Sequence, residues 1–279
     1  MSEPRVLLQG LAYVESPRWR DGRLWFAHWG TDEIIAVDLD GNSEIMAHGP
    51  GGLGWSIDWL PDGRLLVTGG GLVRHEPDGS VVPHADLGNL AEDWNELVVD
   101  GRGNAYVNGG LFGPPDAGPS GVIALVKPDG VVRQVADGLA FPNGMAVTPD
   151  GRTLIVAESW AEQLTAYDIA DDGTLSGRRV WAATPGDHPD GICVDAEGAV
   201  WYADVGNARC VRVREGGEVL DTVGLGRGGF ACMLGGLDGS TLFMLAAEWR
   251  GFEHVEEAIA DRTGQVLVAD APAPRAGWP

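Results

Sequence analysis

The chain has 279 residues, 44% of them hydrophobic and 22% charged, which is typical of a globular protein large enough to bury its own core. Asp and Glu number 41 against 19 Lys and Arg, so the formal net charge at pH 7 is −22. A surface this acidic repels nucleic-acid phosphates and anionic lipid headgroups, so we expect neither nucleic acid nor a membrane as a partner.

The cysteines and the first residues indicate a reducing, cytoplasmic location. Cys193, Cys210 and Cys232 are odd in number and show no CxxC spacing, so we expect no disulfide framework. The start, MSEPRVLLQG, lacks the basic segment and apolar core of a secretory signal. No apolar run approaches the ~20 residues that span a bilayer. We therefore expect a cytoplasmic protein.

A glycine turn followed by a β-rich run recurs along the chain. The copies are DGRLWFA (21–27), DGRLLVT (62–68), RGNAYVN (102–108), DGRTLIVA (150–157), EGAVWYA (197–203) and DGSTLFML (238–245). Glycine supplies the positive φ angle of a tight turn, and the Val, Leu, Trp and Tyr residues after it suit a buried strand. A repeat of 40 to 48 residues built from short strands is typical of a β-propeller.

We therefore expect an all-β fold, with residues 1–279 forming a single six-bladed β-propeller domain of about four strands per blade. Because DG turns also punctuate hairpins in other β proteins, an irregular sandwich or barrel is the alternative. The tail PAPRAGWP (272–279) is expected to be either a surface strap or disordered.

One register position in the repeats carries side-chain oxygens. Blades are related by rotation, so equivalent positions of the repeats meet around the central axis. Counting eight residues back from the turn glycine, or seven in the first repeat, gives Glu15, Trp55, Asn95, Asn143, Asp190 and Ala231. Proline and glycine flank Asn143 and Asp190, and Pro17 follows Glu15 closely, which favours rigid loops that aim one side chain.

Carboxylates and amide carbonyls converging on one point need a cation between them. Every candidate ligand is a hard oxygen donor, so the set favours Ca²⁺, with Zn²⁺, Mn²⁺ and Mg²⁺ as alternatives. Glu15 and Asp190 together would balance the charge of one divalent ion. The alternative is that Asn and Asp beside Pro and Gly form ordinary turns.

Four segments resemble the regucalcin family, also called the senescence marker protein, gluconolactonase and luciferin-regenerating-enzyme family. They are ESPRW (15–19), FPNGMAVTPDGRTLIVAES (141–159), HPDGICVDAEGAVWYAD (188–204) and ACMLGGLDGSTLFMLAAE (231–248). The resemblance, over residues 8–252, implies a six-bladed propeller with one axial divalent metal that hydrolyses lactones and related esters. It implies Glu15, Asn143 and Asp190 as metal ligands, with Asp190 also as the catalytic proton-transfer group, and Asn95 as a contact to substrate or metal.

The sequence departs from the family pattern two residues before Asn95. Sugar lactonases of the family often carry Arg there, and this chain has Asp93, which favours a neutral, more apolar lactone over an anionic sugar acid. We predict substrate contacts from Asn95, its neighbours Trp94 and Glu96, and Trp55 and His28. Further aromatic residues on or near the candidate loops could pack a ring-shaped ligand. These are Phe112, Phe141, Trp160 and Trp249.

The sequence thus predicts a metal-dependent lactonase or esterase acting on a small-molecule lactone or ester. Two alternatives stay open at this point. One is a propeller that binds a small molecule or peptide and keeps its metal for structure, because propellers serve both roles. The other is a family member redirected to a different reaction, such as a biosynthetic step on a natural product. No GxSxG motif points to a serine nucleophile.

Overall fold

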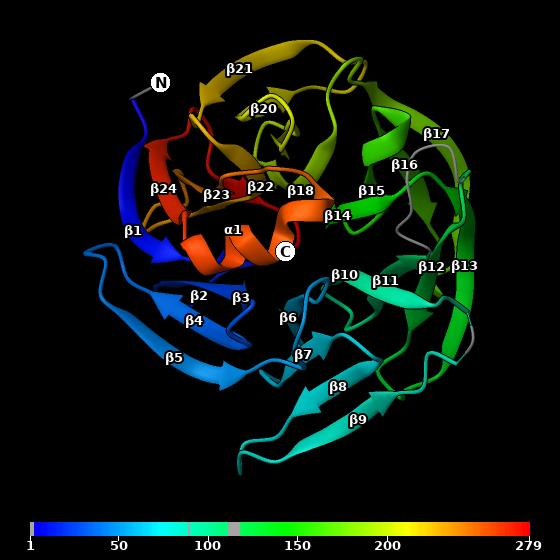
Figure 1. Cartoon of the computed structure of the whole chain (residues 1–279). Helices are drawn as coiled ribbons and strands as arrows, with labels where there is room; N and C mark the ends of the chain where they lie inside the picture. Colours follow the sequence, from blue (N-terminus) through cyan, green and yellow to red (C-terminus); the bar gives the residue numbers. More distant parts are fainter. Residues whose placement is uncertain (1–2, 89, 111–117) are drawn as a thin grey trace.

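The structure, a computed structural model, describes residues 3–88, 90–110 and 118–279. Six antiparallel sheets are arranged radially around one axis, as Figure 1 shows. This confirms the predicted all-β, six-bladed β-propeller. Among the described residues, no helix is both long enough and apolar enough to cross a membrane.

Each blade takes four consecutive strands, except where the chain ends contribute. Blade 1 comprises β2 (Tyr13–Arg20), β3 (Arg23–Trp29), β4 (Glu33–Val37) and β5 (Ser43–His48). Blade 2 comprises β6 (Ile57–Trp59), β7 (Leu65–Thr68), β8 (Leu72–His75) and β9 (Val81–Ala85). Blade 3 comprises β10 (Asp93–Val99), β11 (Ala105–Gly110), β12 (Gly121–Val126) and β13 (Val132–Leu139).

The second half of the ring repeats the arrangement. Blade 4 comprises β14 (Pro142–Val147), β15 (Thr153–Glu158), β16 (Gln163–Ile169) and β17 (Leu175–Ala183). Blade 5 comprises β18 (Pro189–Asp195), β19 (Val200–Asp204), β20 (Arg209–Val213), β21 (Val219–Gly224) and the short β25 (Arg275–Ala276). Blade 6 comprises β22 (Gly228–Gly235), β23 (Thr241–Ala247), β24 (Gly264–Asp270) and β1 (Arg5–Leu11).

Strand β1 closes the ring. It comes from the N-terminal end of the described chain, yet it pairs antiparallel with β24 as the outermost strand of blade 6. The last repeat therefore holds the first strand of the chain through backbone hydrogen bonds. Such closure leaves no blade missing its fourth strand.

The repeated glycines occupy the turns between the first and second strands of the blades. Their φ angles lie between 67° and 87°, a region that favours glycine. The six residues are Gly22, Gly63, Gly103, Gly151, Gly198 and Gly239. The first strand of each blade is the innermost one, so the loop entering that strand opens toward the axis (Figure 1).

The C-terminal tail forms a strap. Strand β25 pairs with β18 of blade 5, and the backbone of Trp278 exchanges two hydrogen bonds with Val147 of blade 4, at 2.7 and 2.9 Å. The Trp278 side chain packs against the apolar core of blades 3 and 4. Of the two expected states of this tail, the surface strap is therefore the one observed.

One helical segment covers an end of the axis. The 3-10 helix η3 (Phe252–His254) and the helix α1 (Val255–Asp261) connect β23 to β24, and Figure 1 shows α1 in front of the centre of the ring. Arg250 pairs with Glu248 and with Asp261, both at 2.6 Å, and so ties the start of the segment to its end. A second 3-10 helix, η2 (Ser159–Ala161), follows β15.

Candidate functional site

The innermost strands are irregular where the predicted site residues lie. In the innermost strands of blades 1, 3, 4 and 5, as in that of blade 6 between Gly229 and Ala231, a register shift of the β-bulge kind interrupts the pairing with the second strand. The shifts fall between Glu15 and Arg18, Trp94 and Leu97, Pro142 and Met145, and Pro189 and Ile192. A bulge bends its strand and re-aims a side chain, which lets polar side chains leave the sheet surface.

Two non-glycine residues beside the site adopt positive φ angles. Ser16 has φ 53° and Phe141 has φ 57°, and they stand one residue after Glu15 and two before Asn143. Backbone in this region costs free energy for ordinary residues and concentrates at functional sites. The chain also approaches itself closely here, since a Cβ atom on Gly144 would lie 2.5 Å from the carbonyl oxygen of Asp190.

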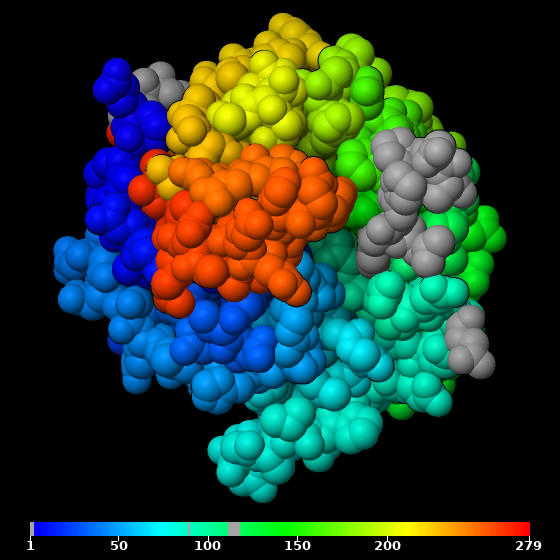
Figure 2. Space-filling model, in the orientation of Figure 1, coloured from blue at the N-terminus to red at the C-terminus, as the bar shows by residue number. Residues whose placement is uncertain are grey.

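A cavity of about 650 Å³ opens at the end of the axis that η3 and α1 cover. The four oxygen-bearing residues of the shared register line it together, although they come from four different blades: Glu15, Asn95, Asn143 and Asp190. All four side chains are buried. Figure 2 shows the orange segment that carries η3 and α1 over the centre of this face, beside a hollow. The structure therefore brings these four residues together around the axis, as expected for equivalent positions of blades related by rotation.

The carboxyl groups at the cavity floor repel one another. Burial raises the pKa of Glu15 well above its usual value, and the charges of Asp190 and Glu96 raise it further. Burial also raises the pKa of Asp190, with Glu96 adding to the effect, while a hydrogen bond from Asn143 opposes it. Protein groups alone therefore leave these two carboxylates poorly compensated.

Arg18 supplies positive charge below this floor. Its guanidinium donates to the carbonyl of Leu97 at 2.7 Å, and lies 3.6 Å from Glu96 and 3.8 Å from Asp58. Burial raises the pKa of Glu96 to about 6, against the opposing effect of Arg18. Glu96 does not line the large cavity. It lines a much smaller one, of about 10 Å³, that shares Glu15 with the large cavity.

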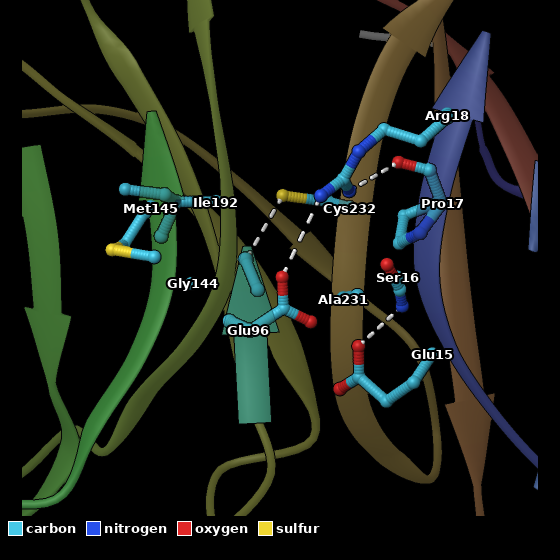
Figure 3. Close-up of a pocket in the computed structure, with 11 residues that line it drawn as sticks. Glu15, Ser16, Pro17, Arg18, Glu96, Gly144, Met145, Ile192, Ala231 and Cys232 are labelled. Atoms are coloured by element: carbon cyan, nitrogen blue, oxygen red, sulfur yellow. Dashed lines mark hydrogen bonds and ion pairs between the residues drawn. The ribbon is translucent and has the colours of Figure 1, made fainter. Parts of the chain in front are cut away.

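Figure 3 shows this smaller space between the innermost strands. The carboxylates of Glu15 and Glu96 point into it from different strands, and Arg18 reaches across to Glu96. The backbone amide of Ser16 donates to the Glu15 carboxylate at 2.7 Å. This bond fixes one Glu15 oxygen, and Glu15 also faces the large cavity.

Polar side chains that the sequence analysis did not single out hold the site loops in place. Asn108 accepts from the amide of Glu96 at 3.1 Å and donates to the carbonyl of Asn143 at 2.6 Å. Thr68 donates to the carbonyl of Asn95 at 2.7 Å. All three bonds are buried. The first lies within blade 3, whereas the other two join neighbouring blades, so the bulged strands β10 and β14 are each held by the blade before them.

The other predicted substrate contacts divide into two groups. Trp94 lines the large cavity, as do Phe141, Trp160 and Trp249, whereas Phe112 lies outside the described residues. Trp55 is 0% exposed and packs in the apolar core between blades 1 and 2. It occupies the predicted register, but its large apolar ring is buried in the core instead of facing the cavity.

His28 also lies outside the lining. Its ring is buried, with Nε2 accepting from the amide of Ala12 at 2.9 Å and Nδ1 within 3.0 Å of Glu33. Both ring nitrogens are thus engaged in holding the backbone and strand ends. The prediction that Trp55 and His28 contact the substrate is therefore wrong, because neither side chain lines the cavity.

The donor set fits a hard cation. In the part of the chain that the structure describes, no three His, Cys, Asp or Glu side chains gather as a metal site by themselves, so amide oxygens would have to complete one. Glu15 and Asp190 supply two buried carboxylates with raised pKa values, and Asn143 and Asn95 face the same cavity. Oxygen donors of this kind match Ca²⁺ or Mg²⁺ better than softer metals.

Comparisons with known proteins agree with this fold. A family model described as "SMP-30/Gluconolactonase/LRE-like region" matches residues 13–248. The diisopropyl-fluorophosphatase of Loligo vulgaris is 28% identical over 201 residues, which cover 63% of this chain and 64% of that protein. The regucalcin of Danio rerio is 32% identical over 203 residues, which cover 68% of this chain and 61% of that protein. The chain thus matches less than two thirds of the length of either relative.

Among solved structures, a luciferin-regenerating enzyme superposes with a TM-score of 0.82 at 18% sequence identity. The match covers 98% of each chain, so it shows that the whole propeller fold is shared.

Proposed function

Because the chain belongs to the SMP-30/gluconolactonase/LRE-like family, we propose that it is a hydrolase that opens lactone or related ester rings with the help of one divalent metal ion. One observation supports this most strongly. Glu15, Asn143 and Asp190 come from three different blades and face one cavity, where burial and mutual repulsion leave the two carboxylates in need of a cation.

Glu15, Asn143 and Asp190 would hold the ion, and Ca²⁺ matches their oxygen donors best. A bound divalent ion would supply Lewis acidity that polarises the ester carbonyl and stabilises negative charge developing on its oxygen. Asn95 lines the same cavity and would contact the substrate or complete the ion's shell.

Asp190 handles the proton in this proposal. Water attacks the acyl carbon, and the Asp190 carboxylate accepts the proton that the water loses. The acyl carbon–oxygen bond of the ring then breaks, and Asp190 returns the proton to the departing ring oxygen. The product is an open-chain hydroxy acid.

Two other functions share this geometry: a metal-containing propeller that binds a small molecule without turnover, and a site redirected to another reaction. The hydrolase is favoured because the relatives that match this chain include a diisopropyl-fluorophosphatase, and because the family name includes a gluconolactonase. Metal binding without hydrolysis of any lactone would favour the alternatives.

Removing the metal is expected to abolish lactone hydrolysis. After treatment with a chelator and desalting, initial rates on a panel of lactones, followed by acid release in a pH-stat, should fall by about 100-fold or more, because carbonyl activation is lost. Adding Ca²⁺ should restore them. Circular dichroism of the stripped protein controls for unfolding. Full activity in protein shown by elemental analysis to be metal-free would contradict the proposal.

A further inference from the structure

The walls of the cavity indicate which lactones would enter it. We propose, resting on the proposed function, that the site selects uncharged and largely apolar lactones, with an aryl or alkyl substituent, over polyhydroxylated or anionic ones.

One wall is a continuous aromatic cluster contributed by blades 1 and 6 and by the segment after β23. The Tyr13 and Phe230 rings lie 5.0 Å apart, Phe230 and Trp249 lie 6.0 Å apart, and Trp249 meets Phe252 edge-on at 5.0 Å. All four residues line the cavity. Because each ring is held by its neighbours, the wall offers preformed apolar surface that costs little entropy to bind against.

A second aromatic group comes from blades 4 and 5. Phe141 and Trp160 lie 5.0 Å apart, and Trp160 meets the imidazole of His188 edge-on at 5.4 Å. These residues line the cavity near Asn143 and Asp190, and Trp94 of blade 3 also contributes. A ring or chain attached to the lactone would therefore contact aromatic surface on both the blade 6 side and the blade 4 side.

The charge of the lining opposes anionic substrates. Among the described residues, no Lys or Arg lines the large cavity, and the segments outside the described residues (1–2, 89 and 111–117) contain no Lys or Arg in their sequence. Arg18, which lines the adjoining small cavity, is held by Glu96 and Leu97. Glu92 and Asp93 add negative charge to the lining. A carboxylate- or phosphate-bearing lactone would meet like charge without a partner.

Several polar groups in the wall are already committed to the fold. The Ser159 hydroxyl donates to the carbonyl of Pro189 at 2.8 Å, and the indole NH of Trp29 donates to the carbonyl of Trp55 at 2.8 Å. The imidazole Nδ1 of His188 lies 3.1 Å from the carbonyl of Ser159. A polyol entering this cavity would lose hydrogen bonds to water that these groups cannot replace, which disfavours it.

The rim carries exposed apolar side chains. Phe252 is 61% exposed and Leu53 is 44% exposed, and both line the cavity. Large apolar groups in water at the mouth of an aromatic cavity are expected where apolar ligands enter. Phe252 stands in the helical segment over the axis, so it can cover a substituent that extends out of the cavity.

The test compares lactones that differ only in their substituent, using the calcium-loaded protein. The panel holds an alkyl-substituted δ-lactone, an aryl-fused δ-lactone, glucono-δ-lactone and a carboxylate-bearing lactone. We expect kcat/KM for the alkyl and aryl members to exceed that of the polyol and carboxylate-bearing members by about 10-fold or more. Calorimetric binding of the corresponding lactams, which resist hydrolysis, should follow the same order.

A matched pair of variants locates the selectivity. Phe252→Ala should raise KM for the alkyl and aryl lactones by about 5-fold or more while leaving KM for unsubstituted δ-valerolactone within about 2-fold. Leu237→Ala removes a side chain that is 92% exposed and outside the cavity, and should change neither.

The outcomes separate this inference from the proposed function. Hydrolysis of lactones with equal or greater preference for the polyol or anionic members, matched by lactam binding, would overturn the inference and leave the hydrolase standing. Apolar lactams preferred without hydrolysis of any lactone would support the inference and remove the hydrolase. Equal effects of Phe252→Ala and Leu237→Ala would also overturn the inference.

Discussion

Replacing Asp190 by Asn is expected to lower lactone hydrolysis by about 1,000-fold or more, while the propeller stays folded. The change keeps the shape of the side chain but removes both the proton acceptor and one of the two charges that would hold the ion. Stability should not fall in metal-free protein, because burial and the charge of Glu96 disfavour the Asp190 carboxylate. Steady-state kinetics and chemical denaturation of the same preparations measure both effects.

Asp195→Asn is the matched control. Asp195 lies on the same strand, β18, and is also buried, but it pairs with Arg212 at 2.7 Å and does not line the cavity. Its loss should lower the free energy of unfolding and leave kcat/KM of the folded protein unchanged. Activity in Asp190→Asn within 10-fold of the wild type would exclude Asp190 from the proposed mechanism.

Replacing Arg18 by Leu is expected to lower the free energy of unfolding by about 3–5 kcal/mol at pH 8, the usual cost of leaving a buried charge without its partner. Arg18 lies beside Glu96 and Asp58, both of them buried, and also donates to two backbone carbonyls. The deficit should shrink at pH 5. Burial raises the pKa of Glu96 and of Asp58, and such groups favour folding while protonated and lose that contribution as pH rises through the folded-state pKa.

The matched control for this second variant is Arg23→Leu. Arg23 forms an ion pair with Glu44 at 3.0 Å, but both side chains are largely exposed, so its removal should cost less than about 1 kcal/mol. Urea denaturation at both pH values compares the two variants. If Arg18→Leu lowered the free energy of unfolding no more than Arg23→Leu does, Arg18 would not be compensating the buried charges of Glu96 and Asp58.

Most of the fold could be predicted from the repeat pattern. Six glycine turns at nearly constant spacing predicted six blades, and the register of Glu15, Asn95, Asn143 and Asp190 predicted their meeting, because rotation about an axis places equivalent residues together. The closure of the ring by β1 was not predicted, since the first strand has no glycine turn to mark it and its partner is the last repeat.

The register alone did not predict which side chains face the cavity. Trp55 shares the register of the oxygen donors, yet its ring packs in the core of blades 1 and 2. In the described structure, β6 pairs with β7 without the register shift that interrupts the innermost strands of the other five blades. Bulges depend on the pairing of two strands, which a single sequence does not record.

Thr68 and Asn108 were overlooked although the sequence contained a signal. Both stand five residues after their turn glycine, in runs that are otherwise apolar. A polar residue at a repeated position of a buried strand must find a hydrogen-bond partner, and here the partners are the loops of the site.

The most direct test is a crystal structure of the calcium-soaked protein, with anomalous diffraction used to locate the ion. A single peak in the axial cavity, with oxygens of Glu15, Asn143 and Asp190 at roughly 2.3–2.6 Å, is the result that our account predicts. An ion bound elsewhere, or these three side chains turned away from an ion in the cavity, would contradict it.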